Sequence, residues 1–397
     1  MLSKLKKANL IKDILSLLVV TFVSKGTTFV INLISAKFLT STEFGLLSIL
    51  RSTAGMLESL FSGINGSIII NEISKDRKVT QDLIYLFVFY IAIISVILFF
   101  IPILSIPINI FVLTILTFSI VLNTIVNLIL IGLSYYSEQK RLTLVSCISS
   151  AIVSIIIIRF YGLQGAAAAF ILLPLIDLVI KSIFLFRKKF ISSSKKGTKK
   201  LIRKSFKYIA IVTPQIILFW WLRVSLGSNA IKELGLFEFL YQFITLIILM
   251  TGAVASVSIG KFGKSDQYNI LRQASLINIT ICIVLISCCL FFGNDLILLI
   301  NSEYDISNRM HLFFTMLLIV LPLSFTSLLS NFFLANGKDT YNILASMFAI
   351  SATVFLVLVS QNSHILTIVY SYLIYYSIVS IIKVFLDLFT VFLILMS

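Results

Sequence analysis

The chain has 397 residues, of which 59% are hydrophobic and 12% charged, and its mean hydropathy is +1.08. Soluble domains have about 45–50% apolar and about 25% charged residues. One water-soluble core could not bury so much apolar surface, so the composition excludes an ordinary soluble protein. It indicates a protein that crosses a membrane many times. The net charge of +16 fits the basic excess in cytoplasmic loops of such proteins, and it does not indicate a nucleic-acid partner.

Apolar stretches of sufficient length for a membrane recur along the whole chain. A spanning helix needs about 20 mostly apolar residues. The sequence therefore predicts an all-α integral membrane protein with about twelve transmembrane helices. The predicted spans are 14–37, 44–70, 82–103, 108–134, 142–159, 163–186, 208–226, 235–259, 273–300, 311–335, 341–360 and 365–394.

A basic stretch at 187–207 lies at the middle of the chain, with ten Lys or Arg and no Asp or Glu. We interpret it as a cytoplasmic linker, part of it an amphipathic helix on the inner leaflet. It divides the chain into an N-terminal six-helix bundle at 1–186 and a C-terminal six-helix bundle at 208–397. With the N-terminus inside, inner loops hold 23 basic residues and outer loops hold 4. We therefore expect both termini in the cytoplasm.

The two halves share a short sequence pattern. Glu43–Ile49 (EFGLLSI) opens the second span, and Glu233–Phe239 (ELGLFEF) opens the eighth, 190 residues later. An even number of spans in each half makes the repeats parallel, related by an axis along the membrane normal. Transporters built in this way bind substrate between the halves and work by alternating access.

Two basic residues interrupt the first two spans, Lys25 and Arg51. A charge at the bilayer centre costs about 2.5–3.5 kcal/mol on insertion scales, so it should face a cavity or a partner. Arg51 could instead pair with Glu58, seven residues later on the same helix face. Lys25 has no acidic residue within a helical turn. Together the two cations suit an anionic ligand such as a phosphate, which Arg can hold bidentately.

Acidic residues within spans are candidates for coupling transport to a Na⁺ or H⁺ gradient. They are Glu58, Asp177 and Glu238. Asp177 has an alternative role, because Lys181 follows it at helical spacing and could neutralise it. Lys181 could also extend to the inner membrane boundary. Lys383 and Asp387 form a second pair of the same spacing.

No catalytic or metal-binding motif is visible in the sequence. His311 and His364 lie near span ends without nearby ligands, and the four cysteines lie in apolar runs. The sequence has no phosphate-binding loop of the ATPase type. We therefore expect a transporter and not an enzyme. We expect no cofactor and no bound metal site, although Na⁺ or H⁺ could drive transport.

Three stretches resemble a known family. Ala36–Ser48 (AKFLTSTEFGLLS) resembles the signature between the first two helices of polysaccharide flippases. Tyr161–Phe170 (YGLQGAAAAF) is similar to their entry into the sixth helix, and Phe332–Lys338 (FFLANGK) to the end of their tenth. The chain thus resembles Wzx-type O-antigen and capsule flippases of the multidrug/oligosaccharidyl-lipid/polysaccharide exporter superfamily.

This resemblance implies a MATE-like fold of two six-helix bundles around a V-shaped cavity. It also implies a substrate, an oligosaccharide on undecaprenyl pyrophosphate, which is moved to the outer leaflet of the bacterial inner membrane. In the related lipid II flippases, basic residues of the first, second and eighth helices line the cavity. Lys25 and Arg51 match the first two, but the eighth helix offers Glu238 and Tyr241, so we assign a third phosphate contact to Arg223. Arg223 could instead extend outward beside Trp220 and Trp221 in an interfacial belt.

Partners implied by the family are membrane lipids and the polysaccharide polymerase and chain-length machinery. Two other functions remain open from the sequence. One is a multidrug or cation exporter of the same fold, for which an acid-lined cavity would be expected. The other is a polytopic enzyme of polysaccharide assembly, but such enzymes usually have a large outer loop, and the outer loops predicted here are short.

Overall fold

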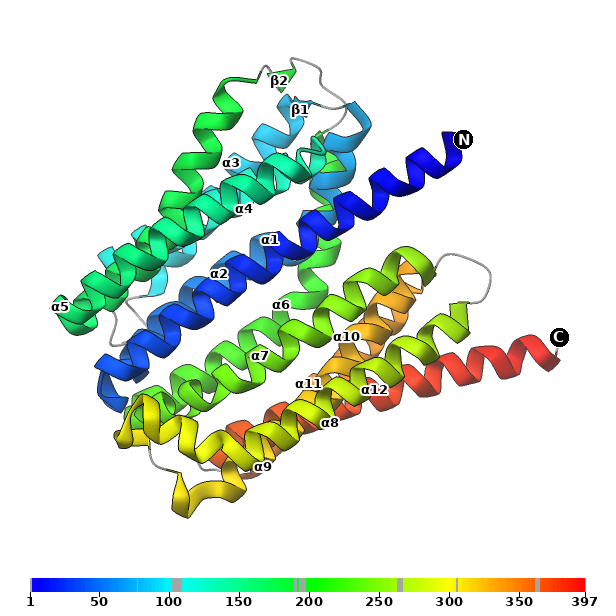
Figure 1. Ribbon diagram of the computed structural model, residues 1–397. Coiled ribbons are helices and arrows are strands. Elements are labelled where there is room, and N and C mark those ends of the chain that lie inside the picture. Colours follow the sequence, from blue (N-terminus) through cyan, green and yellow to red (C-terminus); the bar gives the residue numbers. More distant parts are fainter. Residues whose placement is uncertain are drawn as a thin grey trace. The chain divides into compact units, whose positions relative to one another are not determined.

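A computed structural model of the protein describes residues 2–76, 78–101, 109–188, 191–192, 198–262, 267–304, 306–336, 338–360 and 365–396. These residues are almost entirely helical (Figure 1). The helices are α1 (Leu2–Phe38), α2 (Ser41–Asp76), α3 (Gln81–Phe100), α4 (Ile110–Gly132), α5 (Tyr136–Phe186), α6 (Thr198–Asn229), α7 (Ile231–Phe262), α8 (Gln267–Ile300), α9 (Met310–Leu318), α10 (Val320–Ala335), α11 (Asp339–Ser360) and α12 (Ile365–Met396).

The predicted all-α membrane fold is confirmed. In the described part of the chain, nine helical stretches are long and apolar enough to cross a membrane. One of them, α5, has 51 residues and contains both the fifth and the sixth predicted spans. The span predicted at 311–335 is interrupted at Ile319, between α9 and α10. Pro322 lies in the first turn of α10, where a missing backbone N–H costs little.

The long helix α5 is two helices joined by a sharp reversal at Gly162. This residue has φ 54° and ψ −127°, a conformation open to glycine and costly for residues with a Cβ. The two halves pack closely against each other, because a Cβ built on Gly165 would lie 2.2 Å from the backbone oxygen of Ile157. Ser146 and Asp177, 31 residues apart, are hydrogen-bonded across the pair. The sequence YGLQG therefore encodes a helical hairpin.

Replacing Gly165 with alanine should lower stability by about 3 kcal/mol, at the upper end for overpacking, because the new methyl group would collide with rigid backbone. Gly55 of α2 provides the matched control, since nothing lies within 4 Å of a Cβ built there. Thermal unfolding of the purified protein in detergent compares the two variants. Equal melting temperatures for Gly165→Ala and Gly55→Ala would contradict the tight hairpin.

The chain divides into two compact units. The first unit consists of Met1–Leu39 and Glu43–Ser228, and the second of Thr40–Thr42 and Asn229–Ser397. Helix α6, which contains the seventh predicted span, lies with the first unit. The predicted division into six-helix bundles at 187–207, and their relation as repeats, stay predictions.

Part of the basic stretch is attached to the first unit by strand pairing. Strands β1 (Val79–Thr80) and β2 (Ile191–Ser192) pair in parallel, with Val79 opposite Ile191. From Thr198 the stretch is helical and continues into α6. Residues 193–197 of the predicted linker lie outside the described residues. The pairing thus joins the segment that follows α2 to the segment between α5 and α6.

The core of the second unit is rich in aromatic side chains. Phe332 and Phe333 of α10 are fully buried with Ala255, Ala274 and Leu328. In another part of the same unit, Phe239 of α7 stacks on Tyr304, with ring centroids 4.4 Å apart. The first cluster joins α7, α8 and α10, and the second contact joins α7 to the segment that follows α8.

Candidate functional site

Arg51 lies on α2 within the first unit, and its side chain is half-buried. Its guanidinium carbon lies 4.3 Å from the ring centroid of Phe170, on the second half of α5. A cation over an aromatic face gains about 0.5–2 kcal/mol, the larger value where water is excluded. Stacking on one face leaves the in-plane N–H donors of a guanidinium able to bind a carboxylate or phosphate.

Arg223 of α6 and Arg51 of α2 lie near the same contact between their helices. The indole Nε1 of Trp220 donates a hydrogen bond of 3.0 Å to Oγ1 of Thr53, and this bond sets the register of α6 against α2. Arg223 is three residues after Trp220, and Arg51 is two residues before Thr53, so each arginine is within one helical turn of a residue that forms this bond. A helix rises about 1.5 Å per residue, so each lies about 3–5 Å from that residue along its own helix.

Lys25 lies on α1 with an exposed side chain. Leu39 and Thr40 connect α1 to α2. Lys25 is 14 residues before Leu39 and Arg51 is 11 residues after Thr40, which places them about 21 and about 17 Å from this connection along their helices. The first unit therefore carries the three predicted cations at similar depths, on α1, α2 and α6. Lys25 is more exposed than the other two.

Glu58, the first acidic candidate, is half-buried on α2. Its Oε1 accepts a hydrogen bond of 3.1 Å from Oγ1 of Thr124 on α4. Glu238 lies on α7 in the second unit, where its side chain is 7% exposed. Phe237 and Tyr241 of the same helix stack with centroids 5.7 Å apart. The two carboxylates thus belong to different units, and that of Glu58 is hydrogen-bonded to a hydroxyl group.

Asp177 forms an ion pair with Lys181 in the interior of the first unit. Nζ of Lys181 lies 2.5 Å from Oδ2 of Asp177, and Oγ of Ser146 donates to the other carboxylate oxygen. Lys181 also donates to Oδ1 of Asn127 at 2.7 Å, and Gln139 donates to the same oxygen at 3.2 Å. The side chain of Lys181 is 1% exposed. The predicted pair is confirmed, but the alternative that Lys181 extends to the membrane boundary is wrong, because the ammonium points to these buried acceptors.

A second buried lysine lies in the second unit. Lys383 of α12 is 2% exposed, and its Nζ donates to Oγ of Ser330 on α10. The side chain of its predicted partner, Asp387, lies outside the described residues.

Three residues of the buried network were missed by sequence reasoning, namely Asn127, Gln139 and Ser146. Asn127 gave no distinct signal in the sequence, because Asn123 and several Ser and Thr residues lie in the same predicted span. Such networks hold helices together where water is absent.

Solved structures share this fold. A multidrug resistance MATE family transporter of the MOP superfamily in its inward-facing conformation matches with a TM-score of 0.67 at 13% identity, covering 92% of each chain. An outward-facing conformation of such a transporter matches with the same TM-score of 0.67, at 15% identity over 94% of each chain. A MOP superfamily transporter from Pyrococcus furiosus, described as having a binding pocket of reversed polarity, gives a TM-score of 0.65 at 15% identity, over 94% of each chain.

The fold and the buried charges define an all-α polytopic membrane protein with the fold of MATE transporters of the MOP superfamily. No curated protein matches the sequence. The model of the polysaccharide biosynthesis protein family matches residues 10–226, more than half of the chain. The protein therefore belongs to the polysaccharide biosynthesis protein family, which confirms the resemblance found in the sequence.

Proposed function

We propose that the protein is a flippase that moves undecaprenyl-pyrophosphate-linked oligosaccharide, an O-antigen or capsule repeat unit, from the inner to the outer leaflet. It would do so by alternating access in a bacterial inner membrane, with both termini in the cytoplasm. The observation that carries the proposal is the cationic character of the first unit at the depth of Arg51 and Arg223. In a member of a polysaccharide biosynthesis family, this character suits the pyrophosphate of a lipid-linked sugar.

The charges of the first unit suit different steps of binding. Lys25 is exposed on the first unit and can meet the pyrophosphate as a point charge. Arg51 is held by Phe170 and offers fixed donors to phosphate oxygens. Arg223 adds a third positive charge at that depth, where a carboxylate-lined site would instead favour a cationic drug.

Energy for transport would come from a Na⁺ or H⁺ gradient. Both oxygens of Asp177 are engaged by Lys181 and Ser146, so this carboxylate suits a structural role better than exchange of cations. We therefore assign coupling to Glu58 or Glu238. Glu58 is the better placed for coupling to the cations, because it lies two helical turns from Arg51 on the same helix.

The second candidate function is a multidrug exporter, favoured by the shared fold with multidrug MATE transporters. Its substrates would be lipophilic cations, which the three basic residues of the first unit would repel. The two functions thus predict opposite charge selectivity.

Purified protein in liposomes distinguishes them. One assay follows the flipping of a fluorescent polyprenyl-pyrophosphate-linked disaccharide by its accessibility to a quencher, and another follows uptake of a cationic dye. We expect flipping of the lipid and no uptake of the dye. Lys25→Ala should slow flipping at least about tenfold, the effect of losing about 1.4 kcal/mol of binding energy. Lys25→Arg should retain part of the rate, because the charge survives.

Lys37→Ala is the matched control, because Lys37 is also an exposed lysine of α1 but lies at the end of the helix. It should flip the lipid at the wild-type rate. Dye uptake without lipid flipping would favour the multidrug exporter instead. Equal rates for Lys25→Ala and Lys37→Ala would remove Lys25 from the binding site.

A further inference from the structure

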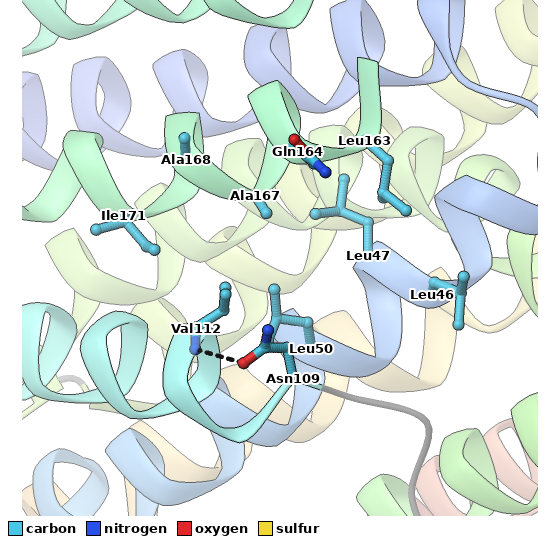
Figure 2. Close-up of a pocket in the computed structure, with 10 residues that line it drawn as sticks. All are labelled: Leu46, Leu47, Leu50, Asn109, Val112, Leu163, Gln164, Ala167, Ala168 and Ile171. Carbon is cyan, nitrogen blue, oxygen red and sulfur yellow. Dashed lines mark hydrogen bonds between the residues drawn. The ribbon is translucent and has the colours of Figure 1, made fainter. Parts of the chain in front are cut away.

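A pocket of about 330 Å³ lies within the first unit, among α2, α4 and the second half of α5 (Figure 2). It is at the end of the unit where α2 and α4 begin and where α5 reverses at Gly162. With the orientation predicted from the basic loops, this is the outer end. The volume is at the lower end of the range of about 300–1,000 Å³ typical of ligand sites. The lining residues are Leu46, Leu47, Leu50, Asn109, Val112, Leu163, Gln164, Ala167, Ala168 and Ile171.

The local sequence creates this space. Ala167 and Ala168 present only methyl groups, while Leu47 and Leu50 approach from α2 (Figure 2). On the remaining side, Asn109 caps α4 by accepting a hydrogen bond from the backbone N–H of Phe111 at 3.0 Å. Larger residues at 167 and 168 would fill the pocket. The run of small residues that opens the predicted sixth span thus does more than form a close helix contact, because it leaves a cavity beside it.

The lining is aliphatic at the base and polar at the mouth. Leu47 and Leu50 are 1% and 6% exposed, whereas the carboxamides of Asn109 and Gln164 are exposed. A sugar would require hydrogen-bond partners for many hydroxyl groups, and two carboxamides cannot supply them. A hydrocarbon chain needs no such partners, and it gains free energy from contact with the leucines.

A cation on α2 adjoins this lining in the sequence. Arg51 follows the lining residue Leu50, and the Phe170 ring on which it stacks precedes the lining residue Ile171. A ligand whose hydrocarbon chain occupies the pocket could therefore have its anionic end near Arg51. This combination is the chemistry of a lipid phosphate.

We propose that the pocket binds the part of the polyprenyl chain that adjoins the pyrophosphate of the substrate. This inference rests on the proposed function and adds to it a site for the lipid on the first unit. Two small side chains, Ala167 and Ala168, line the pocket together with the branched Leu47 and Leu50, and the space that the alanines leave suits the methyl branches of a polyprenyl chain. A straight acyl chain has no such branches.

Photolabelling tests the proposal without requiring transport. The probe is a polyprenyl phosphate with a diazirine in its second isoprene unit, added to the full chain in lipid nanodiscs. We expect mass spectrometry to find the label on peptides containing 46–50, 109–112 or 163–171. Ala167→Leu with Ala168→Leu should reduce this labelling about tenfold. The matched control is Ala92→Leu on α3, where the alanine is exposed, and with this variant labelling of the pocket should be unchanged.

A phosphatidylglycerol with a diazirine in its acyl chain identifies the occupant. We expect this lipid to label the pocket weakly. We also expect unlabelled polyprenyl phosphate to displace the phosphatidylglycerol from the pocket. Equal labelling by the two probes, without competition, would overturn the proposal in favour of an ordinary bilayer lipid. Labelling of other peptides only would overturn it as well. If pocket labelling occurred but flipping failed, the lipid site would stand and the proposed transport function would not.

Discussion

Replacing Lys181 with methionine is expected to destabilise the protein by about 3–5 kcal/mol, because the buried carboxylate of Asp177 would lose its counter-ion. For a unit of this size, such a loss corresponds to a fall in melting temperature of about 10 °C. The long side chain of methionine preserves packing, so the effect reports the charge. Thermal unfolding in detergent, followed by light scattering or intrinsic fluorescence, measures it.

The double variant Asp177→Asn with Lys181→Met provides the decisive control. It removes both charges together, and it should recover most of the lost stability, because replacing a buried pair by neutral groups of similar volume is often nearly neutral. Lys78→Met changes an exposed lysine and should have an effect within about 0.5 kcal/mol. If Lys181→Met were as stable as Lys78→Met, the ion pair would not be a structural element of the first unit.

Reversal of charge at Arg51 should abolish polysaccharide export. In Arg51→Glu, a carboxylate would face the pyrophosphate, and two unit charges about 4 Å apart interact by about 4 kcal/mol at an effective dielectric constant of about 20. The flipping rate should therefore fall more than about a hundredfold. Arg51→Gln should slow flipping less than Arg51→Glu does. Arg51→Lys should slow it least, because lysine keeps the positive charge but lacks the planar guanidinium group.

Measurements of stability distinguish a role of Arg51 in substrate binding from a structural role. Loss of the contact with Phe170 should cost only about 0.5–2 kcal/mol, so Arg51→Gln should remain folded in the membrane while export fails. Arg159→Glu, at an exposed arginine near the tip of the α5 hairpin, is the control for charge reversal. Normal surface polysaccharide in Arg51→Glu cells would remove Arg51 from the substrate path.

The spans and one ion pair could be predicted because both depend on local spacing. Apolar runs of helix length define α3 or α8 without tertiary information, and four residues separate Asp177 from Lys181 on any helix. The partners of that pair could not be predicted, because Ser146 and Asn127 reach it only through the packing of α4 and the two halves of α5. The pairing of β1 with β2 involves two residues from each strand, too few for a sequence pattern.

The roles of the cations were predictable only in part. The free-energy cost of a charge in lipid identified Lys25 and Arg51 as unusual. The aromatic partner of Arg51 could not be predicted, because Phe170 is 119 residues away in the sequence. The pocket had no signal at all in the sequence. Alanines at 167 and 168 are equally compatible with tight helix packing, and only the positions of Leu47 and Leu50 show that space remains.

The α5 hairpin has a consequence for how the protein enters the membrane during synthesis. On insertion scales, an Asp and a Lys at mid-span would each oppose entry by about 2.5–3.5 kcal/mol. Asp177 and Lys181 neutralise each other within one helix, so the pair can form as soon as that helix does. Asn127, Gln139 and Ser146, which complete its hydrogen bonds, are all translated earlier in the chain. When the ribosome delivers the two charges, every group that accommodates them has therefore already been made, and the Gly162 turn brings them together without waiting for the second unit.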